Sequence, residues 1–263
     1  MTPLTPLFPT ALTIAGSDPS GGAGIQADLK TFHSFEVYGT TAITLLTVQN
    51  TCGVSRVEIM PVDFVIQQIQ AVLEDIPASA AKTGALGSAE MIEAIGAEAR
   101  HWTFPLVVDP VLFSKHGAPL ASRNSVEAYR KFLIPYADVL MPNIPEAEEL
   151  CGFSLESPTL IERAAKSLLD LGAKSVVIKG GHLEGDPIDL YFDSAGHRRL
   201  PAKRIQTQNT HGTGCTYAAA AAAGLARGKQ RFAAIRAAKK FVTAAIRANF
   251  EIGHGIGPLN HWV

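Results

Sequence analysis

The stretch ALTIAGSDPSGGAGIQADLKTFHSF, residues 11–35, joins an apolar run to a glycine-rich loop and then to an amphipathic segment. The apolar run Ala11–Ala15 is predicted to be a buried strand that ends in glycine. Residues Gly24–Phe35 are predicted to form a helix, because apolar residues such as Ile25 and Leu29 recur at helical spacing. A strand, a glycine loop and a helix in this order indicate an α/β unit whose loop lies at the end of the strand.

The same alternation of strands and helices continues along the chain. Further strands are expected at Ala42–Val48, Leu106–Asp109, Asp138–Met141 and Ser175–Ile178. Amphipathic spacing predicts helices near Val62–Leu73, Ser88–Arg100, Asn124–Leu133, Leu160–Leu171, Cys215–Arg227 and Phe232–Asn249. An antiparallel pair is expected at Ile188–Phe192 and Arg198–Ile205. Alternating strands and helices predict a mostly parallel sheet covered on both faces, and we expect a single domain over residues 1–263.

Composition limits the class of protein. The chain has 263 residues, of which 47% are hydrophobic and 18% are charged, as in ordinary globular domains. The net charge of -1 lacks the basic excess that is typical of nucleic-acid-binding proteins. Cys52, Cys151 and Cys215 are far apart, which argues against a disulfide framework and against a cysteine-rich zinc site.

The chain carries no sequence that predicts export or membrane insertion. The first ten residues, MTPLTPLFPT, lack the basic region of a signal peptide and contain three prolines. The longest apolar run, near Tyr217–Ala226, is about half as long as a bilayer span requires. We therefore expect a soluble, cytoplasmic protein without a nucleic-acid or membrane partner.

The first glycine loop, GSDPSGGAG at residues 16–24, contains four glycines in nine positions. Glycine permits tight turns and a close approach of a ligand to main-chain N–H groups. A simple turn that caps the next helix is one interpretation. Gly22, Gly24 and Ala27 match the GxGxxA pattern of dinucleotide-binding proteins, but the acidic residue expected about 20 positions later is missing. No Gly-Lys-Ser/Thr sequence follows either, so a loop that cradles a substrate remains.

The second glycine loop, NTHGTGCT at residues 209–216, leads directly into an alanine-rich helix. Gly212 and Gly214 can expose successive N–H groups at the positive end of the helix dipole, which predicts an anion site for a migrating phosphoryl group. Cys215 would lie in the first turn, where the pKa of a thiol tends to fall, so its thiolate is a candidate general base. The alternative is a glycine turn beside a buried, inert cysteine, which is the more frequent situation for a free cysteine considered alone.

Polar side chains follow several of the predicted strands. Asp109, Asn143 and Glu146 offer oxygen atoms that suit Mg²⁺, although helix capping by Asn143 or Glu146 is an alternative. Lys179 can contact a phosphate, or its side chain can be solvated. The Gln49 amide can form hydrogen bonds with the edge of a ring, or it can lie on a surface loop. Because ligands of open α/β sheets bind at the carboxyl ends of the strands, the joint appearance of these residues predicts one site.

Six segments resemble the hydroxymethylpyrimidine/phosphomethylpyrimidine kinases, a family of the ribokinase superfamily. In chain order they are ALTIAGSDPSGGAGIQADLKTF, VQNTCGV, VVDPV, MPNIPEAEEL, VIKGGH and NTHGTGCT. The resemblance implies an α/β fold, namely a ribokinase-like three-layer sandwich in which helices flank a central, mostly parallel sheet, with a small β flap. It also implies ATP and Mg²⁺ as cofactors, and a homodimer. The implied activity is two transfers from ATP in thiamine biosynthesis, which convert 4-amino-5-hydroxymethyl-2-methylpyrimidine to its monophosphate and then to the pyrophosphate.

The resemblance further implies a role for each candidate site residue. The catalytic group comprises Cys215 as the base and the anion hole of Gly212, Thr213 and Gly214. The substrate-binding group comprises Gln49, Gly16, Ala23 and Asp18. The ATP phosphates are assigned to Lys179, Asn143 and Thr216, and the metal ion to Asp109 and Glu146. Most members of the superfamily carry aspartate as the base, and this chain has cysteine, as the pyrimidine kinases do.

One position departs from the family pattern. Many members carry methionine near the substrate ring within a K-[IT]-G-M-L stretch, whereas Lys82-Thr-Gly-Ala-Leu86 has Ala85 at that place. A smaller side chain enlarges the pocket or weakens packing on the ring. Bacterial pyridoxal kinases share the glycine and cysteine signature, so a pyridoxal kinase is the second candidate. A sensor that binds nucleotide or pyrimidine without turnover is the third.

Overall fold

The computed structural model describes residues 8–113, 117, 120, 124–182 and 185–263. The prediction about an N-terminal signal therefore lies largely outside the described residues. Within them, no helix combines the length and the low polarity that a membrane crossing requires.

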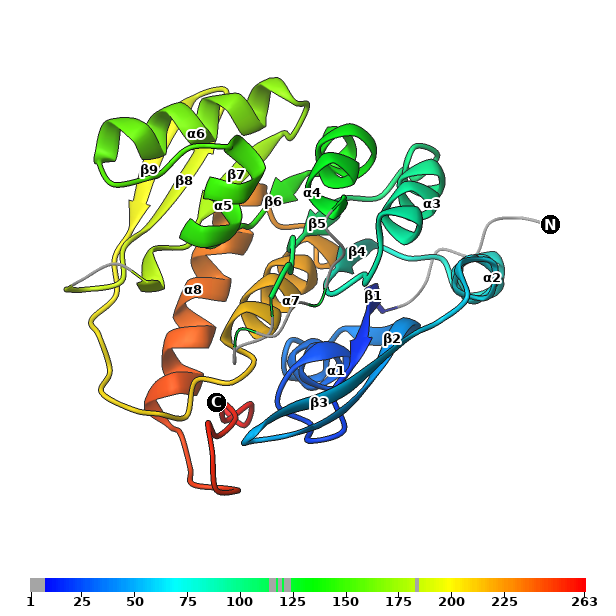
Figure 1. Cartoon of the computed structure of the whole chain (residues 1–263), viewed down its shortest axis with the longest axis horizontal. Coiled ribbons are helices and arrows are strands. Elements are labelled where there is room, and N and C mark those ends of the chain that lie inside the picture. Colours follow the sequence, from blue (N-terminus) through cyan, green and yellow to red (C-terminus); the bar gives the residue numbers. More distant parts are fainter. Residues whose placement is uncertain (1–7, 114–116, 118–119, 121–123, 183–184) are drawn as a thin grey trace.

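The described residues form one nine-stranded sheet in the order β3-β2-β1-β4-β5-β6-β7-β8-β9 (Figure 1). The strands are β1 Thr10–Ser17, β2 Tyr38–Asn50, β3 Gly53–Ile59, β4 Ala80–Thr83, β5 Leu106–Val108, β6 Val139–Leu140, β7 Ser175–Ile178, β8 Asp189–Asp193 and β9 Gly196–Leu200. The pairings from β2 to β7 are parallel, and β3, β8 and β9 add antiparallel strands at the two edges. The parallel centre requires helical crossovers, which cover both faces of the sheet.

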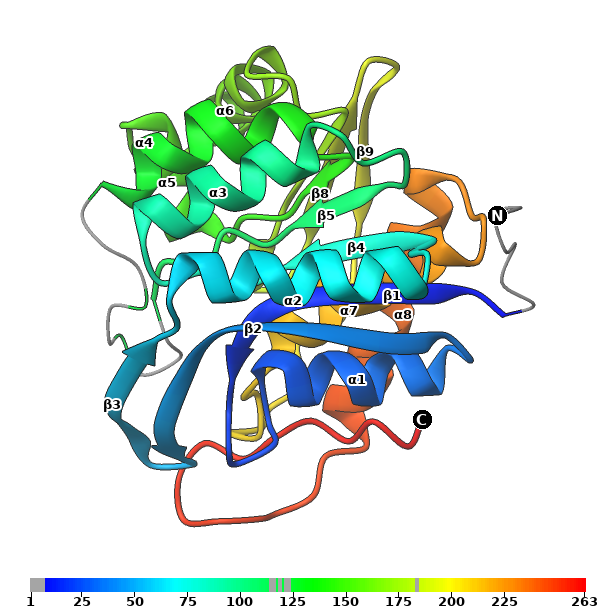
Figure 2. The same ribbon diagram turned by 90° about the vertical axis from the view of Figure 1, so that its right-hand side faces the viewer.

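Helices on both faces make the fold a three-layer sandwich. The helices are α1 Gly24–Ser34, α2 Val62–Asp75, α3 Ala89–Ala99, α4 Ser125–Ala128, α5 Ile144–Cys151, α6 Pro158–Asp170, α7 Thr213–Ala226 and α8 Arg231–Arg247. Alternate residues of a strand point to opposite faces. Leu12 and Ile14 accordingly join the core beneath α2 to α6, whereas Ala11 joins the core beneath α1, α7 and α8. Figures 1 and 2 show these two helical layers on either side of the sheet.

The small β flap is a continuation of two strands at one edge of the sheet. Strand β2 pairs with β1 only as far as Leu46, and its outer part, through Asn50, pairs with β3 alone. Figure 2 shows this two-stranded ribbon projecting beyond the helices, on the side where the chain passes from β1 into α1. Leu46, Val48 and Ile59 on the ribbon are exposed apolar side chains.

The predicted strands and helices form, with several differences; helix α5, for example, was not among the predicted helices. The short strand β4 lies at the centre of the sheet and was not predicted, because its sequence AAKT contains no apolar run. The antiparallel strand β3 was also not predicted, and β9 ends at Leu200 instead of Ile205. The region 124–133 is a helical turn followed by a π-helical turn, Tyr129–Leu133, rather than one regular helix. Tertiary pairing decides such short elements, because their local sequence preference is weak.

Candidate active site

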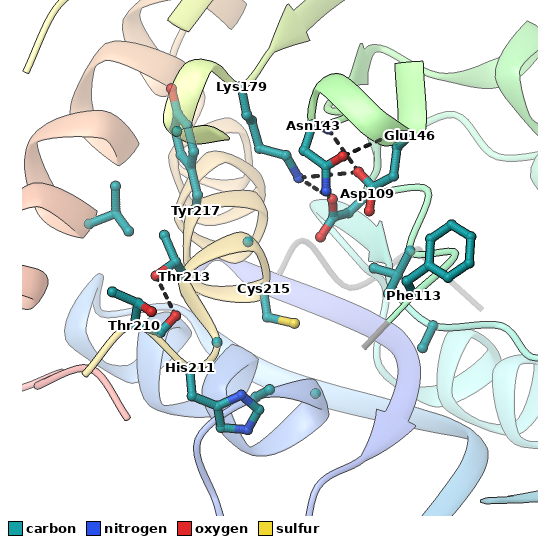
Figure 3. A pocket seen from close by; sticks show the side chains of 18 of the residues that line it. Asp109, Phe113, Asn143, Glu146, Lys179, Thr210, His211, Thr213, Cys215 and Tyr217 are labelled. Carbon is teal, nitrogen blue, oxygen red and sulfur yellow. Dashed lines mark hydrogen bonds and ion pairs between the residues drawn. The ribbon is translucent and has the colours of Figure 1, made fainter. Parts of the chain in front are cut away.

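A cavity of about 670 Å³ opens where the loops after the central strands meet the start of α7 (Figure 3). The candidate residues that line it are Gly16, Asp18, Ala23, Gln49, Ala85, Asp109, Asn143, Glu146, Lys179, Gly212, Thr213, Gly214 and Cys215. These residues come from seven separate loops and strand ends, and the fold brings all of them to one edge of the sheet. Of the predicted site residues, only Thr216 does not line the cavity.

The first glycine loop is organised around the carboxylate of Asp18. Its Oδ1 accepts hydrogen bonds from the backbone N–H and the hydroxyl of Ser20, at 2.9 and 2.7 Å. Its Oδ2 accepts from the N–H groups of Gly22 and Ala23, at 3.2 and 2.8 Å. Burial alone would raise the pKa of Asp18, but the hydrogen bonds from His211 and Ser20 outweigh it and lower the pKa to about 2. The N–H groups of Ser20, Gly22 and Ala23 are therefore paired with the loop's own carboxylate, and the loop lines the cavity with Gly16, Asp18 and Ala23.

His211 joins the two glycine loops beside the β flap. Its Nε2 lies 2.7 Å from Oδ2 of Asp18 and 3.2 Å from the amide nitrogen of Gln49. Since Asp18 is ionised, Nε2 of His211 carries the hydrogen of that bond. Gln49 belongs to the outer part of β2, and Thr47 donates a hydrogen bond of 3.2 Å to its Oε1. Because Nε2 of His211 donates to Asp18, it cannot accept from the Gln49 amide, so among the described residues Thr47 alone holds the amide that was predicted to contact a ring edge, and Gln49 lines the cavity beside His211.

The second glycine loop begins α7 at a point where no side chain fits. Gly212 is the N-cap residue, with φ of 79°. A Cβ atom there would overlap the carbonyl oxygen of Gly22, so the two loops interlock only because both have glycine. Thr213 bonds back to the carbonyl of Thr210 through its N–H and its hydroxyl, at 3.3 and 2.7 Å. The next two N–H groups of the first helical turn have no intrahelical acceptor and remain available to an anion.

An ion cluster faces this helix start from the neighbouring strand ends. The Nζ atom of Lys179 lies 2.6 Å from Oδ1 of Asp109 and 3.9 Å from Oε2 of Glu146. Asn143 and Glu146 form a capping box at the start of α5, with reciprocal hydrogen bonds of 2.8 and 2.9 Å. The capping interpretation is therefore correct, and it leaves both side chains at the cavity. A Cβ on Gly214 would lie 3.7 Å from both Oδ2 of Asp109 and Nζ of Lys179, so the cluster and the helix start share one space.

Burial sets the charge states in this cluster. Burial is the main cause that raises the pKa of Glu146 to about 7. The positive charge of Lys179 opposes this rise, and the negative charge of Asp109 adds to it. Burial alone would lower the pKa of Lys179, but the two carboxylates outweigh it and the pKa is raised. Lys179 therefore remains an ammonium group, and Figure 3 shows it directed between the carboxylates toward the cavity.

Cys215 lies between His211 on one side and the ion cluster on the other (Figure 3). The sulfur atom reaches the cavity surface, whereas protein encloses the thiol on its other sides. Burial is the main cause that raises the pKa of the thiol to about 11. The positive charge of Lys82 opposes this rise, and the negative charges of Asp28 and Asp109 add to it. This direction is opposite to the one predicted from the helix start, because the loss of hydration outweighs the helix dipole.

The comparison with known families identifies this arrangement. A family model described as phosphomethylpyrimidine kinase matches residues 18–260. The chain belongs to the phosphomethylpyrimidine kinase family. The ion cluster, Cys215, the second glycine loop and the first glycine loop from Asp18 onward lie within the matched region.

Members of this kinase family and related vitamin kinases resemble the chain over almost its full length. The hydroxymethylpyrimidine/phosphomethylpyrimidine kinase of Streptomyces coelicolor is 45% identical over 98% of this chain and 96% of its own length. A structure of the Staphylococcus aureus pyridoxal kinase in complex with AMP-PCP and pyridoxal matches with a TM-score of 0.88 and 38% identity, over 97% and 94% of the two chains. A phosphomethylpyrimidine kinase structure from Clostridium difficile matches with a TM-score of 0.80 and 41% identity, over 90% and 99%.

Thr216 does not lie where the family resemblance implied. Its side chain is fully buried, and its hydroxyl lies 2.9 Å from Nε2 of His261 near the chain end. Its hydrogen bond fixes the C-terminal segment against α7 instead of meeting a phosphate. Conversely, Lys82 and the Lys239–Asp189 ion pair of 2.7 Å line the cavity but were not predicted to belong to it. Lys82 begins the stretch 82–86 in which Ala85 was noted, so a signal for it was present and was not used, whereas Lys239 lies on α8 outside any motif.

The carboxylates of the cavity fit a magnesium ion that is shared with a nucleotide. Within the described part of the chain, no three acidic, cysteine or histidine residues are grouped as a complete metal cage. Asp109 and Glu146 both lie near Lys179, beside a helix start that suits phosphate. Mg²⁺ commonly binds one or two carboxylates together with substrate phosphates and water, so this donor set is sufficient.

Proposed function

We propose that this protein transfers the γ-phosphoryl group of ATP to the hydroxymethyl group of 4-amino-5-hydroxymethyl-2-methylpyrimidine, and then adds a second phosphoryl group to the monophosphate, in thiamine biosynthesis. The observation that carries the proposal is one cavity that joins Gln49, Cys215, the start of α7 and the Lys179 cluster. The named activity of the Streptomyces coelicolor relative supports the choice of acceptor. The AMP-PCP in the Staphylococcus aureus structure is an ATP analogue and supports the choice of donor.

In the proposed mechanism, each side of the cavity has its own part. Gln49 holds the edge of the pyrimidine ring, which brings the hydroxymethyl group to Cys215. The thiolate accepts the proton of the hydroxyl, the alcohol oxygen forms a bond to the γ-phosphorus, and the bond from this phosphorus to the leaving oxygen of ADP breaks. The N–H groups of Gly214 and Cys215, with the ammonium of Lys179, stabilise the charge on the transferring phosphoryl oxygens. Asp109 and Glu146 would hold Mg²⁺, which neutralises charge on the phosphates.

A direct assay tests the proposed activity. The purified protein is incubated with ATP, Mg²⁺ and hydroxymethylpyrimidine, and the products are separated by chromatography. We expect the monophosphate first and the pyrophosphate later. Absence of any phosphorylated pyrimidine would reject the proposal, and nucleotide binding without transfer would favour a sensor.

Gln49→Ala is expected to raise the KM for the pyrimidine by roughly 10- to 100-fold with little change in kcat. The amide supplies a hydrogen bond to the ring, and a buried polar partner that is left unpaired costs about 1–3 kcal/mol. The control is Gln70→Ala, because Gln70 on α2 makes only an exposed hydrogen bond to Glu98. An unchanged KM in Gln49→Ala would mean that another part of the cavity holds the ring.

Ala85 makes pyridoxal the second candidate acceptor. Ala85 lines the cavity, and its carbonyl accepts a hydrogen bond of 2.6 Å from Thr44, which fixes its backbone at the wall. We expect Ala85→Met to narrow the space beside the ring and to lower kcat/KM for pyridoxal more than for the pyrimidine. Parallel assays with both acceptors measure this ratio. A wild-type kcat/KM that strongly favours pyridoxal would reverse the assignment of the main substrate.

We further propose that the protein is a homodimer that uses the β2–β3 ribbon. The exposed apolar side chains of Leu46 and Val48 lie on one face of this ribbon, and a second copy would remove them from water. Leu46→Glu together with Val48→Glu should shift the mass measured by light scattering from dimer to monomer. The control Lys174→Glu, on the far side of the sheet, should leave the mass unchanged. A wild-type monomer at micromolar concentration would contradict the proposal.

We also propose that the chain works as one kinase domain in the cytoplasm. The three cysteines, which the structure describes as unpaired, suit a reducing compartment.

A further inference from the structure

Residues 253–258, with the sequence GHGIGP, contact the tip of the β flap and have no part in the scheme above. We call this segment the strap. The N–H groups of His254 and Gly255 each donate to the hydroxyl oxygen of Thr51 at 3.2 Å, and the N–H group of Ile256 donates to the carbonyl oxygen of Thr51 at 2.8 Å. Thr51 lies in the turn that directly follows β2. Figure 2 shows the C-terminal segment passing close to this tip of the ribbon.

The other end of the strap contacts the second glycine loop. The N–H group of His211 donates to the carbonyl oxygen of Gly257 at 3.0 Å, and His211 and Pro258 form an isolated parallel bridge. A Cβ atom on Gly257 would lie 2.2 Å from Oδ1 of Asn209, so the strap packs directly on the loop that begins α7. The strap therefore connects the tip of the flap to the start of α7.

The contact with the flap is so close that it requires glycine. A Cβ atom on Gly255 would lie 2.1 Å from the carbonyl oxygen of Thr51, and one on Gly253 would lie 2.4 Å from the hydroxyl oxygen of Thr51. The chain end does not need this contact, because other hydrogen bonds anchor it. The side chain of Asn260 donates to the carbonyl oxygen of Ala248 at the end of α8, and the hydroxyl of Ser34 on α1 donates to the backbone of residue 261, at 2.9 and 2.8 Å.

The flap is the part of the acceptor site that has the least support from the sheet. The outer residues of β2 pair with β3 alone. On the side toward the sheet, the hydroxyl of Thr47 donates to the carbonyl oxygen of Ser17 at 2.9 Å. Gln49 lies midway between Thr47 and Thr51, so the position of its amide at the cavity depends on how both ends are held.

We propose that Thr51 is a positioning residue: through the strap it holds the flap against the start of α7, and so places Gln49 for the pyrimidine ring. The acceptor binds between Gln49 on the flap and Cys215 on α7, and the strap joins these two elements from outside, since none of its residues lines the cavity. The inference rests on the proposed role of Gln49 in holding the ring.

Gly255→Ala is the main variant, because its Cβ atom meets the backbone of Thr51 and must separate the strap from the flap. We expect the KM for the pyrimidine to rise by about 3- to 10-fold, as the loss of one or two hydrogen bonds commonly has an effect of this order, while the KM for ATP is unchanged. Thr51→Val, which removes the hydroxyl acceptor but keeps the branched shape, should act in the same direction. Thr51→Ser keeps the acceptor and should restore the wild-type KM.

Gly53→Ala is the matched control, because Gly53 lies in the same turn and a Cβ atom there would meet no atom within 4 Å. It should leave both KM values unchanged. Hydrogen–deuterium exchange measures the contact without turnover: the N–H group of Ile256 and the flap residues 47–54 should exchange faster in Gly255→Ala than in the wild type or in Gly53→Ala.

The inference is wrong if exchange in the flap is unchanged in Gly255→Ala, or if exchange is faster and the KM for the pyrimidine remains at the wild-type value. If thermal unfolding shows that Gly255→Ala does not fold, the comparison of Thr51→Val with Thr51→Ser decides by the same criteria. A failure of the proposed kinase activity would appear separately, as the absence of product with the wild-type protein, whatever the exchange rates.

Discussion

Replacement of Cys215 by alanine is expected to lower kcat by about 10²–10⁴-fold while the affinity for ATP changes little. Loss of a general base commonly costs this factor, because the acceptor hydroxyl must then lose its proton to water. Cys215 lines the cavity between His211 and the ion cluster. In the proposed mechanism, only the acceptor hydroxyl requires its thiolate. The measurement is steady-state kinetics together with a nucleotide-binding titration.

The dependence of kcat on pH sharpens this prediction. Burial raises the pKa of the thiol to about 11, so the base is mostly protonated near neutral pH and its active form increases with rising pH. The wild-type kcat should therefore increase between pH 7 and pH 9, and Cys215→Ala should lose that increase. Cys52→Ala is the control, since Cys52 is exposed and does not line the cavity. A near-normal kcat in Cys215→Ala would remove the thiolate from the mechanism.

Replacement of Lys179 by methionine is expected to lower kcat by about 10²–10³-fold and to raise the KM for ATP. Lys179 is the cation within 2.6 Å of Asp109 and 3.9 Å of Glu146, beside the helix start that is proposed to receive the phosphoryl group. Loss of a preorganised group that stabilises transition-state charge commonly has an effect of this size. The two buried carboxylates would also repel each other, so the pKa of Glu146, already raised to about 7 by burial, should rise further.

Two comparisons separate this role from a purely structural one. Lys174→Met removes a lysine from an exposed ion pair and should leave kcat and the KM for ATP unchanged. Lys179→Arg keeps the positive charge and should retain more activity than Lys179→Met at equal thermal stability. If the KM for ATP is unchanged in Lys179→Met, the ammonium does not meet the phosphates.

Local signals explain why much of the site could be predicted. Gly212 has a positive φ and approaches the first loop closely. Glycine is the residue that meets both requirements, so the position can be recognised from the sequence. Asp109 and Lys179 follow apolar strands whose carboxyl ends meet at one edge of a parallel sheet. A parallel sheet brings these strand ends to one edge whatever the order of the strands, and the alternation of strands and helices was sufficient to predict a mostly parallel sheet.

The misplaced or missed residues depend on contacts across long distances in the chain. Thr216 belongs to the glycine motif, yet its side chain turns toward His261, 45 residues further along. Asp18 and His211 are 193 residues apart, and the hydrogen bond that joins their two loops was not predicted. A local sequence pattern cannot predict hydrogen bonds between residues so far apart in the chain, because each residue by itself resembles an ordinary loop residue.

By itself, the sequence determined the α/β sandwich, the two glycine loops and the edge of the sheet at which the chemistry takes place, because strand periodicity and glycine's backbone freedom are local properties. Only the tertiary structure decided the protonation of Cys215 and the partners of Asp18 and Thr216. Hydration and charge pairing depend on which atoms surround a group, and packing alone brings those atoms together.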